Sequence, residues 1–168
     1  MPNTYTLIAS STVGAGGASS IDFTSIPSTY TDLVLKMSLR GTSAATYAAV
    51  KVQFNGSTSN LSCKQLFGDG ASANSSSSAT QIVFDTDAAN NTASTFGNHE
   101  MYIPNYAGST NKSVSIDSVM EQNGTTAYAE LVAGLWANTA AINQVTIAPT
   151  ANNFAQYSTA YLYGVKNA

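Results

Sequence analysis

The segment 31–41 has the clearest alternation of apolar and polar side chains in the chain. Its inward set would consist of every second residue, namely Leu33, Leu35, Met37 and Leu39. A period of two residues places these side chains on one face of an extended strand, whereas on a helix it would scatter them around the axis. The segment therefore predicts a half-buried strand at the centre of a sheet.

Other segments show the same alternation, or short apolar runs, between clusters of glycine, proline, asparagine and serine. They predict further strands at 4–9, 20–24, 50–54, 60–67, 82–84, 96–104, 114–120, 127–136, 145–147 and 157–165. Strands of this length with turn signals between them are typical of sandwiches. We expect an all-β fold, an antiparallel β-sandwich, in which residues 1–168 form a single domain.

Asn55-Gly56 is a strong signal for a two-residue hairpin, because a type I′ turn needs a positive φ at both central residues. A hairpin here would join the strands 50–54 and 60–67 and set Val50 opposite Leu61. Both residues are apolar, so this pairing predicts a shared inward face.

A second hairpin is predicted at Asn123-Gly124. With a two-residue loop, Ile116 faces Leu131 on the inward side, and Asp117 faces Glu130 on the other side. Two carboxylates directly opposite each other repel, unless a cation or a shared proton compensates. The pair is therefore a candidate cation site or acid–base pair, but a shifted register or a neighbouring lysine would equally remove the conflict.

Two polar segments are predicted as loops. The serine-rich stretch 71–78 has nothing apolar to bury, so we expect a mobile surface loop there. The stretch 85–91 contains Asp85 and Asp87 and offers several oxygen ligands for calcium, but it lacks the glycine and glutamate of an EF-hand loop. An ordinary turn rich in aspartate and asparagine is the simpler interpretation.

Other residues of catalytic type show no known spacing. His99 and Glu100 are consecutive on one predicted strand and must point to opposite faces, so they do not form an acid–base pair. The single cysteine, Cys63, has no partner for an internal disulfide. The glycine-rich stretch 13–18 is followed by a strand pattern instead of the helix that a phosphate-binding loop requires. We expect no enzyme activity, no cofactor and no bound metal.

Charge and composition narrow the choice of partners. Charged residues make up 9% of the chain, and the six basic residues are scattered singly against nine acidic ones. Without a basic stripe, binding to nucleic acid is not expected. No apolar run approaches the ~18 residues of a membrane-spanning helix, and residues 1–5 do not resemble a signal peptide.

Aromatic residues are the candidates for an interface. Three tyrosines lie on one face of the last predicted strand, Tyr157, Tyr161 and Tyr163. Such side chains bury area and still offer a hydroxyl to a partner, so they suit a contact with another subunit or another protein surface. Trp136, the only tryptophan, suits such an interface or the core, and a sugar-stacking platform is the alternative.

Both ends of the chain resemble small structural proteins of tailed phages, especially those of cyanophages and related marine phages. The likeness rests on the stretches 5–10, 21–27, 30–35 and 161–166, read as YTLIAS, IDFTSIP, YTDLVL and YLYGVK. It covers about the first 40 and the last 10 residues and leaves the middle, where such proteins carry their specific contacts, unmatched.

The resemblance implies a jelly-roll-like virion protein on the outer capsid surface. It implies a capsid decoration, or cement, protein that binds the major capsid protein as a homotrimer and bridges neighbouring capsomers. The alternative is a tail-fibre or receptor-binding module that recognises host surface glycan. A third hypothesis, a polysaccharide hydrolase, would depend on Asp117 and Glu130.

Overall fold

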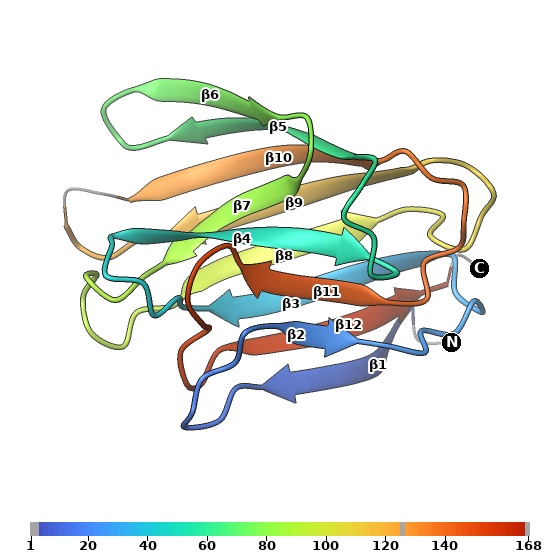
Figure 1. Ribbon diagram of the computed structural model, residues 1–168, viewed down its shortest axis with the longest axis horizontal. Coiled ribbons are helices and arrows are strands. Elements are labelled where there is room, and N and C mark those ends of the chain that lie inside the picture. The colour runs from blue at the N-terminus through green and yellow to red at the C-terminus, as the bar shows by residue number, and fades with distance from the viewer. Residues whose placement is uncertain (1–3, 125–126, 167–168) are drawn as a thin grey trace.

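The computed structural model describes residues 4–124 and 127–166, and within them the chain forms twelve strands and no helix. The strands make two antiparallel sheets that face each other (Figure 1). No helix in the described part of the chain is long and apolar enough to cross a membrane. The expected all-β antiparallel sandwich is confirmed.

The larger sheet has eight strands, and the smaller has four. In spatial order the larger sheet consists of β1 (Tyr5–Thr12), β12 (Thr159–Val165), β3 (Asp32–Leu39), β8 (Gly97–Ile103), β9 (Lys112–Met120), β10 (Tyr128–Trp136), β5 (Leu61–Gly68) and β6 (Ala73–Ser78). The smaller sheet consists of β2 (Ile21–Phe23), β11 (Val145–Pro149), β4 (Tyr47–Phe54) and β7 (Ile82–Asp87). In Figure 1, β6 and β1 lie at opposite ends of the larger sheet.

The strand order is that of a jelly roll with two added hairpins. Without the hairpins β5–β6 and β9–β10, the two sheets read β1-β12-β3-β8 and β2-β11-β4-β7. The remaining strands pair as nested antiparallel partners, β1 with β12, β2 with β11, β3 with β8 and β4 with β7. This nesting defines the jelly roll. Both added hairpins extend the larger sheet beyond β8.

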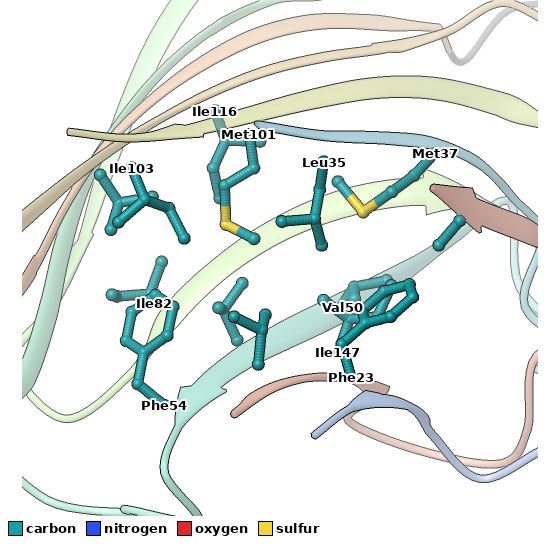
Figure 2. Close-up of a cluster of buried hydrophobic side chains, with 14 of the residues drawn as sticks. Phe23, Leu35, Met37, Val50, Phe54, Ile82, Met101, Ile103, Ile116 and Ile147 are labelled. Atoms are coloured by element: carbon teal, nitrogen blue, oxygen red, sulfur yellow. The ribbon is translucent and has the colours of Figure 1, made fainter. Parts of the chain in front are cut away.

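The core lies between the two sheets, as the alternation predicted. Figure 2 shows Leu35 and Met101 of the larger sheet pointing toward Val50 and Phe54 of the smaller one. The four inward residues of β3 are all buried, and so is every second residue of β9 from Lys112 to Met120. Burial of this contiguous apolar layer is the main stabilising contribution to such a fold.

The prediction of a hairpin at Asn55-Gly56 is wrong, because the two flanking strands do not pair with each other. Both residues have the positive φ that the signal requires, 52° and 69°, but β4 pairs with β7 and β11 while β5 pairs with β10 and β6. The Asn55 side chain accepts hydrogen bonds from the backbone N–H groups of Asn143 and Gln144. The turn is thus fastened to the start of β11, and the chain crosses to the other sheet.

The second predicted hairpin exists, but its loop is longer and its register differs. Met120 pairs with Tyr128, and Ile116 pairs with Val132 instead of Leu131. The two-residue loop at 123–124 was therefore wrong, and part of the loop, residues 125–126, lies outside the described residues. The longer loop exchanges the two faces of β10.

The serine-rich stretch is a strand, not a loop. β6 pairs along its length with β5, although its side chains are small and mostly exposed. The preceding turn is capped by Asp69, whose Oδ1 accepts the N–H groups of Ala71 and Ser72 at 2.9 and 2.7 Å. Backbone pairing with a neighbouring strand, and not burial of side chains, accounts for β6.

Candidate functional site

Asp117 and Glu130 do not form the predicted carboxylate pair. Asp117 pairs with Leu131, and Glu130 pairs with Ser118, so the two acids lie on opposite faces of the larger sheet. Glu130 is buried between the sheets, whereas Asp117 is exposed on the outer face. The juxtaposition on which a hydrolase or a cation site was based is absent because the register differs by one residue.

Glu130 instead forms a hydrogen bond with the backbone of β7, which is an edge strand of the smaller sheet. One carboxylate oxygen accepts the backbone N–H of Asp85 at 2.9 Å, and the other accepts the Gln65 side-chain amide at 2.6 Å. Ser118 Oγ donates to the carbonyl of Asp85 at 2.8 Å. These side chains of the larger sheet satisfy backbone groups that an edge strand otherwise leaves unpaired. Burial raises the pKa of Glu130 to about 7, and it raises the pKa of Asp85 to about 6.

His99 belongs to the same buried network. Its ring nitrogens lie 2.9 Å from Ser118 Oγ and 2.9 Å from Thr86 Oγ1, and its ring packs against Phe84. Glu100 points outward, so the prediction that the two residues face opposite ways is confirmed. Burial lowers the pKa of His99 to about 3. A neutral histidine enclosed in the core does not contact solvent or a substrate there.

The candidate calcium segment begins as strand, and the turn that follows surrounds a guanidinium group. Asp85 and Asp87 lie in β7, so the predicted turn begins after them. The following loop places carbonyl oxygens of Ala89, Asn91, Thr92 and Thr95 around the Arg40 guanidinium, at 2.7 to 3.3 Å. The positive charge among these oxygens is therefore that of Arg40.

Asp87 is a buried carboxyl group with incomplete hydrogen bonding. Its Oδ1 accepts a hydrogen bond from Asn91 Nδ2, while Asp87 Oδ2 and Asn91 Oδ1 are buried with no partner among the described residues. Burial raises the pKa of Asp87; the Asn91 hydrogen bond and the charge of Arg40 oppose this effect, and Glu121 adds to it. A proton on Oδ2 would remove the buried negative charge of this group.

We therefore expect Asp87→Asn to be at least as stable as the wild type at pH 8. An asparagine presents the same shape and brings its own N–H donor without a buried charge. The measurement is the melting temperature of both proteins at pH 5 and pH 8, with Asp69→Asn at the exposed turn as the control. A melting temperature that falls by several degrees at pH 8 in Asp87→Asn would show that the carboxylate is required.

The predicted aromatic residues lie in different environments. Tyr161 and Tyr163 project from the outer face of β12, with Leu162 buried on the other side as predicted. Tyr157 precedes the strand, at a positive φ of 72°, and is 67% exposed. Trp136 is 1% exposed and packs against Phe54 in the core, so it presents no surface to a partner.

The outer face of the larger sheet carries most of the large exposed apolar side chains. At one end are Tyr5, Leu7 and Tyr161, from β1 and β12. At the other end the exposed residues come from β5, β8, β9 and β10, and they are Leu66, Tyr102, Val119, Leu131 and Leu135. Monomeric proteins rarely leave so large an apolar face without a function.

A groove crosses the strands at the second of these ends. We define the groove by the outward residues Lys64, Leu66, Tyr102, Ser115, Asp117, Leu131 and Ala133, together with Glu100. The small side chains of Ala133 and Ser115, which lie side by side on β10 and β9, form its floor. Leu66 and Leu131 are direct cross-strand neighbours and line the groove beside this floor. The groove has a volume of about 620 Å³.

Charged side chains lie at both limits of the groove. Lys64 is on β5, while Asp117 and Glu100 face each other across β9 and β8 at the opposite limit. Glu100 also forms an ion pair with Lys36 of β3. The row Asp117–Glu100–Lys36 leads across the strands from the groove to Tyr161, and the neighbouring row leads from Tyr102 through the buried Val34 to Tyr163.

Sequence reasoning missed the groove because both faces of β10 are apolar. Leu131 was predicted to point inward, yet it is 59% exposed, and Leu66 beside it is 56% exposed. The alternate residues of the strand include Val132 and Trp136, which are equally apolar and lie in the core. The one usable signal was this excess of apolar residues on both faces of a single strand.

Comparisons with known proteins assign no family. No protein-family model matches the chain, and no curated protein sequence matches it. Among solved structures, the galectin LEC-6 of Caenorhabditis elegans aligns over 94% of this chain and 96% of its own length, with 9% sequence identity and a TM-score of 0.33. A likeness this weak carries no conclusion, and the strand order alone defines the fold.

Proposed function

We propose that the chain is a capsid decoration protein of a tailed phage, which binds the major capsid protein on the outer surface of the virion. The observation that carries this proposal is the apolar outer face of the larger sheet. It carries exposed leucines and tyrosines on β1, β12, β8, β10 and β5, with only a few charges among them. Such a face suits adhesion to another protein surface.

The placement of the phage-like segments supports the proposal. The stretches 5–10, 30–35 and 161–166 fall mainly on β1, β3 and β12, which are adjacent in the larger sheet. Two of them pair directly, with Tyr5 opposite Val165 and Leu7 opposite Tyr163. The unmatched middle of the chain supplies the groove, as expected if a shared frame carries contacts specific to each phage.

A modest interface is enough for such a role. A decoration protein meets a repeating surface in many copies, so weak contacts add up when several copies are joined. The absence of a catalytic pair at Asp117 and Glu130 is compatible with this role, because adhesion requires no reaction. We propose no enzyme activity for the chain.

The test is the stability of phage particles with and without the protein. Particles that lack it are expected to release their genome at a lower temperature, and purified protein added back is expected to restore the wild-type release temperature. Equal release temperatures for both kinds of particle would contradict the proposal.

A second candidate is a tail-tip module that binds glycan. It is favoured by one observation, the exposed Tyr102 beside the carboxylates Glu100 and Asp117, since sugars bind to aromatic rings next to hydrogen-bond acceptors. Gold-labelled antibody on intact particles separates the two candidates. Label over the head supports decoration, whereas label at the tail together with binding on a glycan array supports the second candidate.

A further inference from the structure

We propose that the groove is the capsid-binding surface and that its partner is a protein segment with an apolar side chain next to a basic one. This inference rests on the proposed function and adds to it both the contact surface and the chemistry of the partner. The apolar side chain would lie over Leu66 and Leu131, and the basic side chain would lie beside Asp117.

The apolar part of the partner follows from the shape of the groove. Leu66 and Leu131 are direct cross-strand neighbours, and more than half of each side chain is exposed. The floor beside them is made of Ala133 and Ser115, whose small side chains leave a volume of about 620 Å³. A large apolar side chain inserted there would bury both leucines and displace poorly bound water. Interface hot spots are usually well-packed, desolvated contacts of this kind.

The basic part of the partner follows from the charges. Asp117 lies directly opposite Glu100 across β9 and β8, and like charges in this position repel. Lys36 pairs with Glu100, but Asp117 has no ion pair with any residue of 4–124 or 127–166. A lysine or arginine of a partner next to Asp117 would remove this repulsion and fix the direction in which the segment lies.

The charge at the other limit of the groove also favours one direction of the bound segment. Lys64 stands on β5 at the far side of Ala133 from Asp117, and it also has no ion pair within the described residues. A segment that crosses the groove would thus place its basic residue over β9 and β8 and a neutral or acidic residue over β5. The reverse direction would set like charges against each other at both limits.

The experiment measures binding to phage heads assembled without the protein. The purified chain is mixed with these heads and sedimented, and the bound copies are titrated for the wild type and three variants. Leu131→Asp and Asp117→Lys alter the groove. Tyr47→Asp is the control, because Tyr47 is also an exposed large side chain but lies on β4 of the smaller sheet, away from the outer face of the larger one.

We expect Leu131→Asp to weaken binding about 30-fold or more, as for the loss of a hot spot. Asp117→Lys is expected to weaken binding about tenfold and to make it less sensitive to salt, since it removes an attraction between opposite charges. Tyr47→Asp should bind like the wild type. Circular dichroism and melting curves of all variants verify that each is folded.

Each outcome has a separate meaning. If both groove variants bind like the wild type, the groove is not the contact surface, while decoration of the capsid stands. If Asp117→Lys binds more tightly, the partner is acidic and the inferred chemistry is overturned. If the wild type fails to bind the heads, the proposed function fails, and this inference fails with it.

Discussion

Removal of residues 161–168 is expected to yield insoluble protein. β12 lies inside the larger sheet and hydrogen-bonds to β1 on one side and β3 on the other. Its loss would detach β1, expose the edge of β3 and remove the buried Leu162. A long apolar edge of this kind pairs with other chains and promotes aggregation.

The fraction of soluble protein after expression measures this effect. Removal of residues 166–168 alone is the control, since it ends the chain after β12 and should leave the protein soluble. Gly164→Ala is a finer test and is expected to lower the melting temperature, because a Cβ at position 164 would collide with the ring of Tyr30. Soluble, folded protein from the longer deletion would show that β12 is not needed for the sandwich.

The pH dependence of stability is the second large expected effect. Glu130 ionises with a pKa of about 7 in the folded protein, compared with 4.5 for an ordinary glutamate. Between these two values the unfolded chain loses its proton and the folded chain retains it, so stability falls as the pH rises from about 4.5 to 7. For a group this buried, the loss is on the order of 3 kcal/mol.

His99 acts in the opposite direction. Its pKa is about 3 in the folded protein and 6.5 for an ordinary histidine. As the pH falls from 6.5 toward 3, the unfolded chain binds a proton that the folded chain excludes, so stability falls on the acid side. Between about pH 4.5 and 6.5 the two effects oppose each other, so Glu130 and His99 together predict a plateau of stability there. Asp85, whose pKa burial raises from 3.8 to about 6, adds a loss of stability as the pH rises over that interval.

Melting temperatures between pH 3.5 and 8.5 test this prediction. Glu130→Gln should make the slope of melting temperature against pH more positive between about pH 4.5 and 7. His99→Gln should make that slope more negative below about pH 6.5. The slopes with pH are compared, and not the absolute melting temperatures, because each variant also loses hydrogen bonds of the buried network. Unchanged slopes would mean that neither group titrates abnormally.

Much of the fold followed from the sequence, because burial imposes a period of two on each strand that covers the core. The inward residues of β3 and β9 were predicted correctly from this period alone. The period says which side chains share a face, but it does not say which strands are neighbours. The Asn55-Gly56 turn adopts the predicted backbone, yet its strands separate because Asn55 bonds to the start of β11.

The candidate site was harder to predict than the fold. Its position depends on the register of β10, and that register is set by a loop whose length the Asn123-Gly124 signal did not reveal. β6 was missed for a related reason, because a strand held by backbone pairing needs no apolar side chains. The Asp69-Gly70 turn that precedes it was the overlooked hairpin signal.

The two added hairpins make the groove separable from the rest of the molecule. Apart from Glu100 and Tyr102, every residue that lines the groove comes from β5, β9 or β10, outside the eight strands of the jelly roll. Mutations of the outward residues of these hairpins, such as Leu66 and Leu131, leave the core between the nested strand pairs untouched. The binding specificity proposed for the groove is therefore free to change while the framework stays constant, and the same hairpins are natural sites for grafting a foreign epitope onto the chain.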